Sequence, residues 1–167
     1  MNINYMCGFE EYKGNLIHPT AIIDDCVELG VGNIIGAYAI IGANGNIRNT
    51  NHYEFKGKIK IGDNNKIGEF SIITRSVQGL TQIGSENLIM HNVSIGHDSI
   101  IGNNNEIGIG SIVGGYAKIG NNCKIKINVT IRNRIEIKDN VLIGMGANVV
   151  KSVNKDIRIW GNPAKSL

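Results

Sequence analysis

Residues 83–108 read IGSENLIMHNVSIGHDSIIGNNNEIG, and every sixth residue from Ile83 onward is aliphatic. The rule holds at twelve successive positions without an exception, ending at Val149. Two earlier runs, within residues 17–47 and 61–73, obey the same rule. Gly often follows the aliphatic residue, and the fourth position after it is usually small. The chain is therefore organised as a six-residue repeat.

A period of six fits neither the 3.6-residue turn of an α-helix nor the two-residue alternation of a single strand. Short extended stretches with a bend every six residues do fit, and Gly and Asn at the bends supply left-handed backbone conformations. Three such stretches close one triangular coil, and successive coils pair as parallel strands about 4.8 Å apart. We predict an all-β chain, a parallel β-helix of about seven coils over residues 16–153. Residues 1–15 are expected to form an N-terminal cap segment and residues 154–167 a C-terminal tail.

Two interruptions of the period predict loops on this solenoid. The first, at residues 74–82, adds four residues to a hexad, and the second, around residues 49–58, adds two. Loops carried by a rigid scaffold often hold functional residues. Without further information, a surface insertion with no function is an equally good interpretation.

The composition is biased as a repeat protein's would be. The sequence has 31 Ile, 22 Gly and 23 Asn but only two Pro. Its three cysteines, Cys7, Cys26 and Cys123, have neither a pairing nor a metal-site spacing, which favours a reduced, cytoplasmic protein. We expect no membrane span, because no stretch approaches about 20 apolar residues.

Charge is distributed unevenly along the chain. Residues 118–167 hold ten Lys and Arg against three acids, whereas residues 1–117 hold seven against eleven. A basic end indicates an anionic partner, such as the phosphates of a coenzyme or an acidic carrier protein. A lysine-rich surface that is merely solvated is the alternative. No nucleic-acid partner is expected.

His97 is the candidate for chemistry. It stands two positions after Ile95, at an outward corner of the predicted coil, and Gly115 follows one full coil later. An imidazole beside an unobstructed backbone N–H can act as a base next to an oxyanion donor. Asp98 is adjacent in sequence, but its side chain leaves from the next backbone position, so we assign it no orienting role. An exposed corner histidine without function is the alternative.

The segment 84–98, GSENLIMHNVSIGHD, resembles the active-site coil of the UDP-N-acetylglucosamine acyltransferases of lipid A biosynthesis, which are hexapeptide-repeat proteins. Residues 17–23 (IHPTAII) and 77–81 (VQGLT) are also similar to that family. The resemblance implies a left-handed coil. It also implies that His97 is the general base and that Gly115 offers its N–H to the oxyanion.

The chain departs from that family at the neighbouring positions. Tyr116 stands where the family has a second histidine, and Arg132 stands where it has a third. We assign Asn92, Tyr116 and Arg132 to substrate binding. The residues after 153 do not resemble the helical C-terminal domain of the family.

The C-terminal part instead resembles hexapeptide acetyltransferases that use acetyl-CoA. The similar segments are residues 144–153, GMGANVVKSV, and 161–165, GNPAK. This resemblance implies coenzyme binding through Gly146, Ala147, Lys151 and Lys165, with acetyl-CoA as co-substrate. A thioester on acyl carrier protein is the alternative donor. The alternative role of residues 161–165 is to close the end of the solenoid.

The two resemblances imply an acyltransferase that moves an acetyl or longer acyl group from acetyl-CoA to a sugar. The acceptor would be a hydroxyl or amine of a nucleotide-linked sugar or surface-glycan precursor. An acyl carrier protein-dependent O-acyltransferase of the UDP-N-acetylglucosamine type is the main alternative. A non-catalytic scaffold is a weaker one. A hexapeptide-repeat carbonic anhydrase is another, but the spacing of His91 and His97 does not match its three-histidine zinc site, and no metal is expected.

The sequence also predicts a homotrimer. Apolar residues such as Ile109, Ile127 and Val141 are expected to point outward on the predicted prism. Left uncovered, they would form exposed apolar patches, which usually mark an interface. In related enzymes the active site lies between neighbouring subunits.

Overall fold

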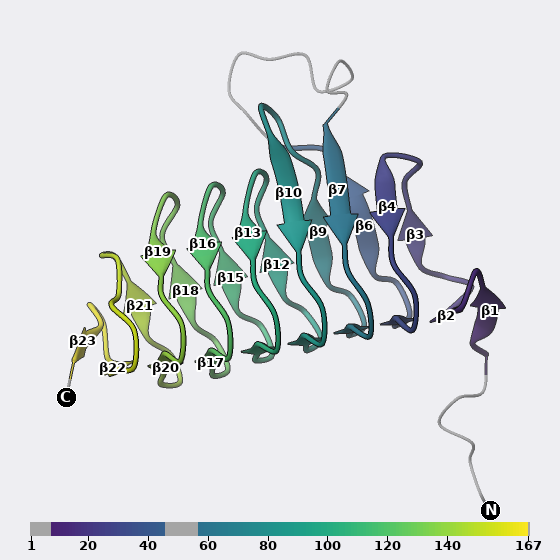
Figure 1. The fold of residues 1–167 in the computed structure, drawn as a ribbon. Helices are drawn as coiled ribbons and strands as arrows, with labels where there is room; N and C mark the ends of the chain where they lie inside the picture. The colour runs from purple at the N-terminus through teal and green to yellow at the C-terminus, as the bar shows by residue number, and fades with distance from the viewer. Residues whose placement is uncertain (1–7, 46–56, 167) are drawn as a thin grey trace, which may run out of the picture.

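The computed structural model describes residues 8–45 and 57–166. These residues wind into a triangular solenoid whose three faces are β-sheets, with the N-terminal and C-terminal ends at opposite ends of the stack (Figure 1). None of them forms a helix that is long and apolar enough to cross a membrane.

Sheet A is the longest face and holds ten strands. In spatial order they are β1 (Glu10–Tyr12), β2 (Asn15–Ile17), β5 (Ile34–Ile35), β8 (Lys66–Ile67), β11 (Leu88–Ile89), β14 (Glu106–Ile107), β17 (Lys124–Ile125), β20 (Leu142–Ile143), β22 (Arg158–Trp160) and β23 (Lys165–Ser166). The pairs β1–β2 and β22–β23 are antiparallel and close the two ends of the sheet, and the other pairs are parallel.

Sheets B and C form the other two faces. In spatial order, sheet B contains β3 (Ile22–Ile23), β6 (Ile40–Ala43), β9 (Ile72–Thr74), β12 (Ser94–Ile95), β15 (Ile112–Val113), β18 (Thr130–Ile131) and β21 (Asn148–Val149). Sheet C contains β4 (Val27–Leu29), β7 (Lys58–Ile61), β10 (Leu80–Ile83), β13 (Ile100–Ile101), β16 (Lys118–Ile119) and β19 (Glu136–Ile137). All pairs within these two sheets are parallel.

The hexapeptide period fixes the register of the strands. Ile89 pairs with Ile107 and Ile107 with Ile125, so one strand pairs with the strand one coil later in the chain. The predicted left-handed parallel β-helix of about seven coils is confirmed.

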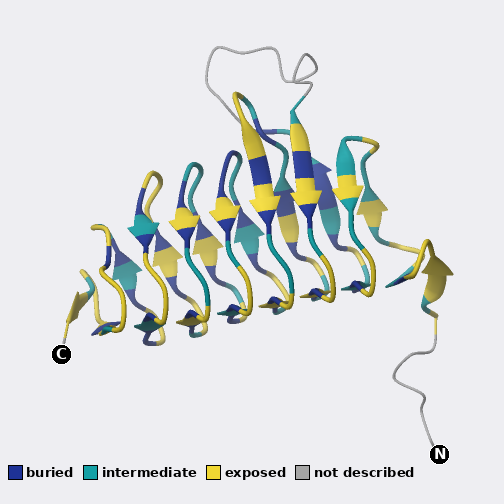
Figure 2. Ribbon diagram, viewed as in Figure 1, coloured by how far each residue is buried: buried dark blue, intermediate teal, exposed yellow. Residues whose placement is uncertain are grey.

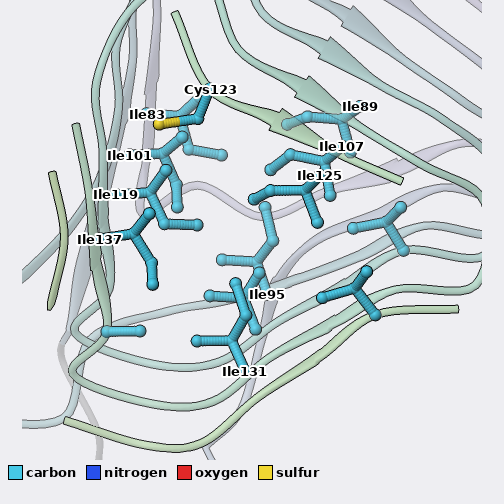
Figure 3. Packing of buried hydrophobic residues seen from close by; sticks show 14 of the residues in the cluster. Ile83, Ile89, Ile95, Ile101, Ile107, Ile119, Cys123, Ile125, Ile131 and Ile137 are labelled. Carbon is cyan, nitrogen blue, oxygen red and sulfur yellow. The ribbon is translucent and has the colours of Figure 1, made fainter. Parts of the chain in front are cut away.

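The aliphatic residue of each hexad fills the interior. Isoleucines from the three sheets meet along the axis of the solenoid (Figure 3), and Ile89, Ile95 and Ile107 have no exposed surface. Along the strands, exposed residues alternate with these buried ones (Figure 2). Two of the predicted outward residues, Ile109 and Ile127, are exposed. The prediction for Val141 was wrong, because it occupies the small fourth position of its hexad and is 1% exposed.

The bends use two different positions of the hexad. The residue three places after the buried aliphatic has a positive φ, as at Asn104 (54°) and Asn122 (56°). The glycine directly after the aliphatic has another purpose. A Cβ on Gly96 would lie 2.5 Å from the N atom of Gly115, so this glycine permits close stacking of successive coils.

A buried asparagine ladder runs along the corner between sheets C and A. The side-chain oxygen of each member accepts hydrogen bonds from the backbone N–H and the side-chain amide of the next, through Asn15, Asn33, Asn65, Asn87 and Asn105. These residues are at most 2% exposed. Because each buried amide is satisfied, the ladder links successive coils without an unpaired polar group.

The two interruptions of the period differ in size. The loop at residues 75–79 connects β9 to β10 and adds the four residues that the sequence predicted. The other interruption is larger than predicted. Leu29 pairs with Ile61, so this coil contains fourteen residues more than the usual eighteen, whereas the sequence predicted two more. Ile47, which we counted as a repeat position, and residues 49–56 lie outside the described residues.

Candidate active site

His97 lies directly after β12, where the chain turns from sheet B to sheet C. We call the bends on this edge the B–C corner: residues 96–99, 114–117, 132–135 and 150–152. The His97 side chain is 19% exposed, so it is more covered than a simple corner residue would be. Its Nδ1 lies 2.8 Å from Oδ2 of Asp98.

Asp98 is held by the loop at residues 75–79. Its carboxylate accepts hydrogen bonds from the backbone N–H groups of Val77 (2.9 Å), Gln78 (3.1 Å) and Gly79 (2.6 Å). The Asp98 N–H donates to the hydroxyl of Thr81 at 2.8 Å. With a side chain only 4% exposed, Asp98 is fixed on both its backbone and its carboxylate.

The same contacts set the ionisation of Asp98. Burial raises the pKa of the carboxyl, but the hydrogen bonds from His97 and from the three loop N–H groups lower it by more. The net pKa lies below the usual value of an aspartic acid, so the group is an anion at neutral pH. An anionic acceptor at Nδ1 keeps the proton of a neutral imidazole on that nitrogen and leaves the lone pair on Nε2.

Gly115 lies under the free side of the imidazole, one coil along the axis. A Cβ at position 115 would be 2.9 Å from His97 Nε2 and 3.0 Å from Cε1, so a larger residue here would displace the ring. Within residues 8–45 and 57–166 the Gly115 N–H has no acceptor, while its carbonyl accepts from the Arg134 N–H at 3.0 Å. A basic nitrogen and an open N–H donor thus lie side by side.

Tyr116 forms the outer wall of this site. Its N–H donates to the His97 carbonyl at 2.9 Å, and its ring meets the imidazole edge-to-face with centroids 5.0 Å apart. The guanidinium carbon of Arg134 lies 4.2 Å from the centre of the Tyr116 ring. Of the residues assigned to the substrate, Tyr116 is therefore in contact with His97.

The other assigned substrate residues lie further from the imidazole. Arg132 is exposed on the B–C corner two coils beyond His97, and the residue stacked on Tyr116 is Arg134 rather than Arg132. Asn92 is exposed at the bend between sheets A and B, at the other end of β12 from His97.

The residues assigned to the coenzyme are spread over two corners. Lys151 is exposed on the B–C corner, three coils beyond His97. Gly146 forms a bend between sheets A and B with φ 66°, and Lys165 is exposed in β23 at the edge of sheet A. Ala147 is 1% exposed and belongs to the core.

His91 lies apart from His97. It follows β11 at the bend between sheets A and B, where its Nδ1 is 3.7 Å from the carboxylate of Glu69. His91 and His97 are thus on different corners of the prism.

Comparison with known proteins shows what this chain resembles. The family model of the bacterial transferase hexapeptide (six repeats) matches residues 116–151. A solved UDP-N-acetylglucosamine acyltransferase from Bacteroides fragilis 9343 is 30% identical with a TM-score of 0.87, covering 92% of this chain and 60% of its own. The UDP-N-acetylglucosamine O-acyltransferase from Moraxella catarrhalis RH4 is 29% identical with a TM-score of 0.76, covering 90% and 73%. The predicted resemblance to hexapeptide-repeat acyltransferases is confirmed.

Two relatives make the resemblance more particular. The acyl-[acyl-carrier-protein]–UDP-N-acetylglucosamine O-acyltransferase of Rickettsia canadensis (strain McKiel) is 37% identical over 91 residues, covering 47% of this chain and 34% of its own. The enzyme of the same name from Rippkaea orientalis is 38% identical over 80 residues, covering 45% and 27%. This chain spans about a third of the length of these relatives.

Sequence reasoning missed two members of the site. Asp98 was given no orienting role, yet it bonds His97 directly, because its backbone is in the left-handed region with φ 58°. The four-residue insertion before Thr81 was the available signal, since it supplies the loop that anchors the carboxylate. Arg134 was missed because we read the corner two positions too early, at Arg132. Counting 18 residues from Tyr116 would have found it.

Proposed function

We propose that this chain is an acyltransferase that moves an acyl group from a thioester to a hydroxyl or amine of a nucleotide-linked sugar or glycan precursor. The observation that carries the proposal is the His97–Asp98 pair, with the imidazole directly above Gly115 and its open N–H. The acyltransferase names of the relatives support the same chemistry.

The residues can perform the transfer in two steps. Nε2 of His97 takes the proton of the acceptor hydroxyl as its oxygen bonds to the thioester carbonyl carbon. The carbonyl oxygen becomes an oxyanion, which the Gly115 N–H stabilises by hydrogen bonding. When the tetrahedral intermediate collapses, the carbon–sulfur bond breaks and the thiolate leaves with the proton held by His97. Asp98 stabilises the imidazolium between the two steps.

The donor is a thioester of coenzyme A or of acyl carrier protein. Exposed Lys151 on the same corner as His97 supports an anionic donor of either kind. The printed names of the Rickettsia and Rippkaea relatives specify acyl carrier protein and UDP-N-acetylglucosamine. These names support a second candidate function, in which acyl carrier protein donates an acyl group to a hydroxyl of UDP-N-acetylglucosamine. They favour this reaction over acetyl transfer from acetyl-CoA. No resident metal is required by this mechanism.

The active assembly is proposed to be a homotrimer that associates through sheet B. The outward residues of this sheet carry no charge: Ile22, Ile40, Ile72, Ser94, Ile112, Thr130 and Asn148. By contrast, sheet C presents charged residues such as Glu28, Lys60 and Lys118. Three of the sheet B isoleucines are exposed, including Ile22 at 60% and Ile112 at 49%, and an uncharged apolar face of this extent indicates an interface.

We also infer a cytoplasmic location, which the free thiols of Cys26 and Cys123 support.

A thiol-release assay tests the proposal. The intact protein is incubated with acetyl-CoA, longer acyl-CoA or acyl carrier protein thioesters, each with UDP-N-acetylglucosamine and with its amino-sugar counterparts. We expect acceptor-dependent thiol release with at least one pair, and mass spectrometry of the product would give the acylated position. If no pair gives release above the rate without acceptor, the chain is not an acyltransferase of nucleotide sugars.

A further inference from the structure

The B–C corner carries a second feature beside the base, formed by Tyr116 and Arg134. The backbone holds both residues one above the other, because Tyr116 donates to the His97 carbonyl and Arg134 donates to the Gly115 carbonyl. Their side chains then stack, with the guanidinium carbon 4.2 Å from the ring centre. The Tyr116 ring of this stack also meets the His97 imidazole edge-to-face, with the ring centroids 5.0 Å apart.

Both residues occupy backbone positions that are unfavourable for them. Tyr116 has φ 60° and Arg134 has φ 61°, in the left-handed region that Gly and Asn prefer. The four equivalent bends on the other corners of the same two coils are Gly110, Asn122, Asn128 and Asn140. Bulky residues in strained conformations persist where function compensates for the strain. The strained backbone of Tyr116 and Arg134 therefore makes their stack a candidate functional feature.

The charge of Arg134 is not neutralised by the fold. The guanidinium is exposed, and among the described residues no carboxylate forms an ion pair with it. Arg132 and Lys151, exposed on the same corner, also have no ion-pair partner in that part of the chain. Stacking on Tyr116 orients the planar guanidinium while leaving its N–H edge available, which is the geometry for bidentate binding of a phosphate.

The position of this cation relative to the base sets the size of the ligand. The two ring contacts together place the guanidinium carbon no more than about 9 Å from the centre of the His97 imidazole. One sugar ring with its anomeric phosphate is about the size that fits within this limit, with a ring hydroxyl at His97 and the phosphate at the cation.

We infer that Arg134, stacked on Tyr116, binds the diphosphate of the acyl acceptor and so places the sugar hydroxyl at His97. This inference rests on the proposed function, since the ligand is the acceptor of that reaction. It makes Arg134 a specificity-determining residue for anionic acceptors. Neutral sugars would lack the group that it binds.

The test measures equilibrium binding, so that it does not depend on turnover. Titration calorimetry of uridine diphosphate and, separately, of coenzyme A is carried out on the intact protein and on Arg134→Asn. Asn suits the left-handed bend, so this variant should be at least as stable in thermal unfolding. Lys60→Gln, which removes one exposed positive charge from sheet C, is the control. We expect Arg134→Asn to weaken the binding of uridine diphosphate by about tenfold or more, with coenzyme A binding unchanged and Lys60→Gln like the wild type.

Four results would overturn the inference. The first is that the wild-type protein does not bind uridine diphosphate, and the second is that Arg134→Asn binds it as tightly as the wild type. The third is that Lys60→Gln weakens this binding as much as Arg134→Asn does. The fourth is that Arg134→Asn loses only coenzyme A binding, which would assign the cation to the donor. A lower unfolding temperature of Arg134→Asn would also count against it, by giving the arginine a structural purpose. The proposed function fails separately, through the absence of thiol release, which leaves these binding measurements intact.

Discussion

Asp98 fixes the orientation of His97: its Oδ2 lies 2.8 Å from His97 Nδ1, and the loop at residues 75–79 fixes the carboxylate in turn. The relationship is directional, because three loop N–H groups donate hydrogen bonds to the Asp98 carboxylate, which in turn accepts a hydrogen bond from the imidazole N–H. The insertion that interrupts the repeat therefore acts on His97 through Asp98.

Replacing Asp98 by Asn should lower turnover more than substrate binding. The amide is nearly the same size, but it cannot stabilise an imidazolium, and its NH2 group would oppose one of the loop N–H donors. We expect kcat to fall by about a hundredfold to a thousandfold, within the range typical of general-base catalysis, and the acceptor KM to change little. Steady-state kinetics checks this. An unchanged kcat would mean that His97 does not need its carboxylate partner.

The stability of the protein should depend on pH through the same residue. Because the pKa of Asp98 is lowered in the folded state, its ionised form stabilises the fold above the unfolded pKa of about 3.9. That contribution should be lost as the pH falls through the lower folded value. The difference in unfolding temperature between wild type and Asp98→Asn should therefore be constant near neutral pH and shrink below about pH 4.

Asp25→Asn serves as the matched control for this measurement. Asp25 is exposed and forms no hydrogen bond among the described residues. Its replacement should leave the pH dependence of the unfolding temperature close to that of the wild type. If the unfolding temperature of Asp98→Asn runs parallel to that of the wild type down to acid pH, the assigned ionisation of Asp98 is contradicted.

The fold could be predicted from the sequence because one rule repeats. Each hexad places an aliphatic residue such as Ile89 in the core, and the repetition reinforces a pattern that a single strand could not establish. The asparagine ladder was not foreseen, since the side-chain amide of buried Asn33 depends on hydrogen-bond partners from adjacent coils, such as Asn15 and Asn65. The fourteen-residue insertion was misjudged because Ile47 fits the period by position alone.

The site was less predictable because it depends on bends and not on strands. The position of His97 above Gly115 follows from counting one coil, and the structure agrees. The bond to Asp98 depends on a left-handed backbone and on a loop that the repeat does not encode. The period places Arg134 one coil beyond Tyr116, but the stacking of the two side chains depends on their conformation, which no sequence period specifies.

The proposed trimer predicts that sheet B is sensitive to charge. Ile112→Glu places a carboxylate in the middle of the uncharged face, where burial in an interface would be costly. We expect the wild-type mass from light scattering to be that of three chains and the variant to be monomeric. Ile100→Glu, at a 40% exposed position on sheet C, should remain trimeric. A monomeric wild type would contradict both the trimer and a site shared between subunits.

Donor binding is predicted to depend on the basic C-terminal end. Lys151→Ala and Lys165→Ala should each raise the donor KM, with a larger effect at low ionic strength, where charges are less screened. Lys151 should have the larger effect, because it is on the corner that carries His97. Lys66→Ala, an exposed lysine of sheet A far from that corner, is the control. If neither C-terminal change alters the donor KM at low salt, this segment only closes the solenoid.

The central prediction concerns His97. A general base contributes about a hundredfold to ten thousandfold to the rate, so His97→Ala should lower turnover by that order. Stability should change little, because the ring lies outside the isoleucine core and keeps 19% of its surface exposed. His97→Asn can still accept a hydrogen bond but cannot take up a proton, so it should be nearly as inactive. Retention of more than about a tenth of the wild-type rate by His97→Ala would exclude His97 as the base.

The size of the loss in His97→Ala should also depend on the acceptor, because an amine that is already neutral needs less help than a hydroxyl. Comparing the loss on hydroxyl and amino sugars would therefore distinguish O-transfer from N-transfer.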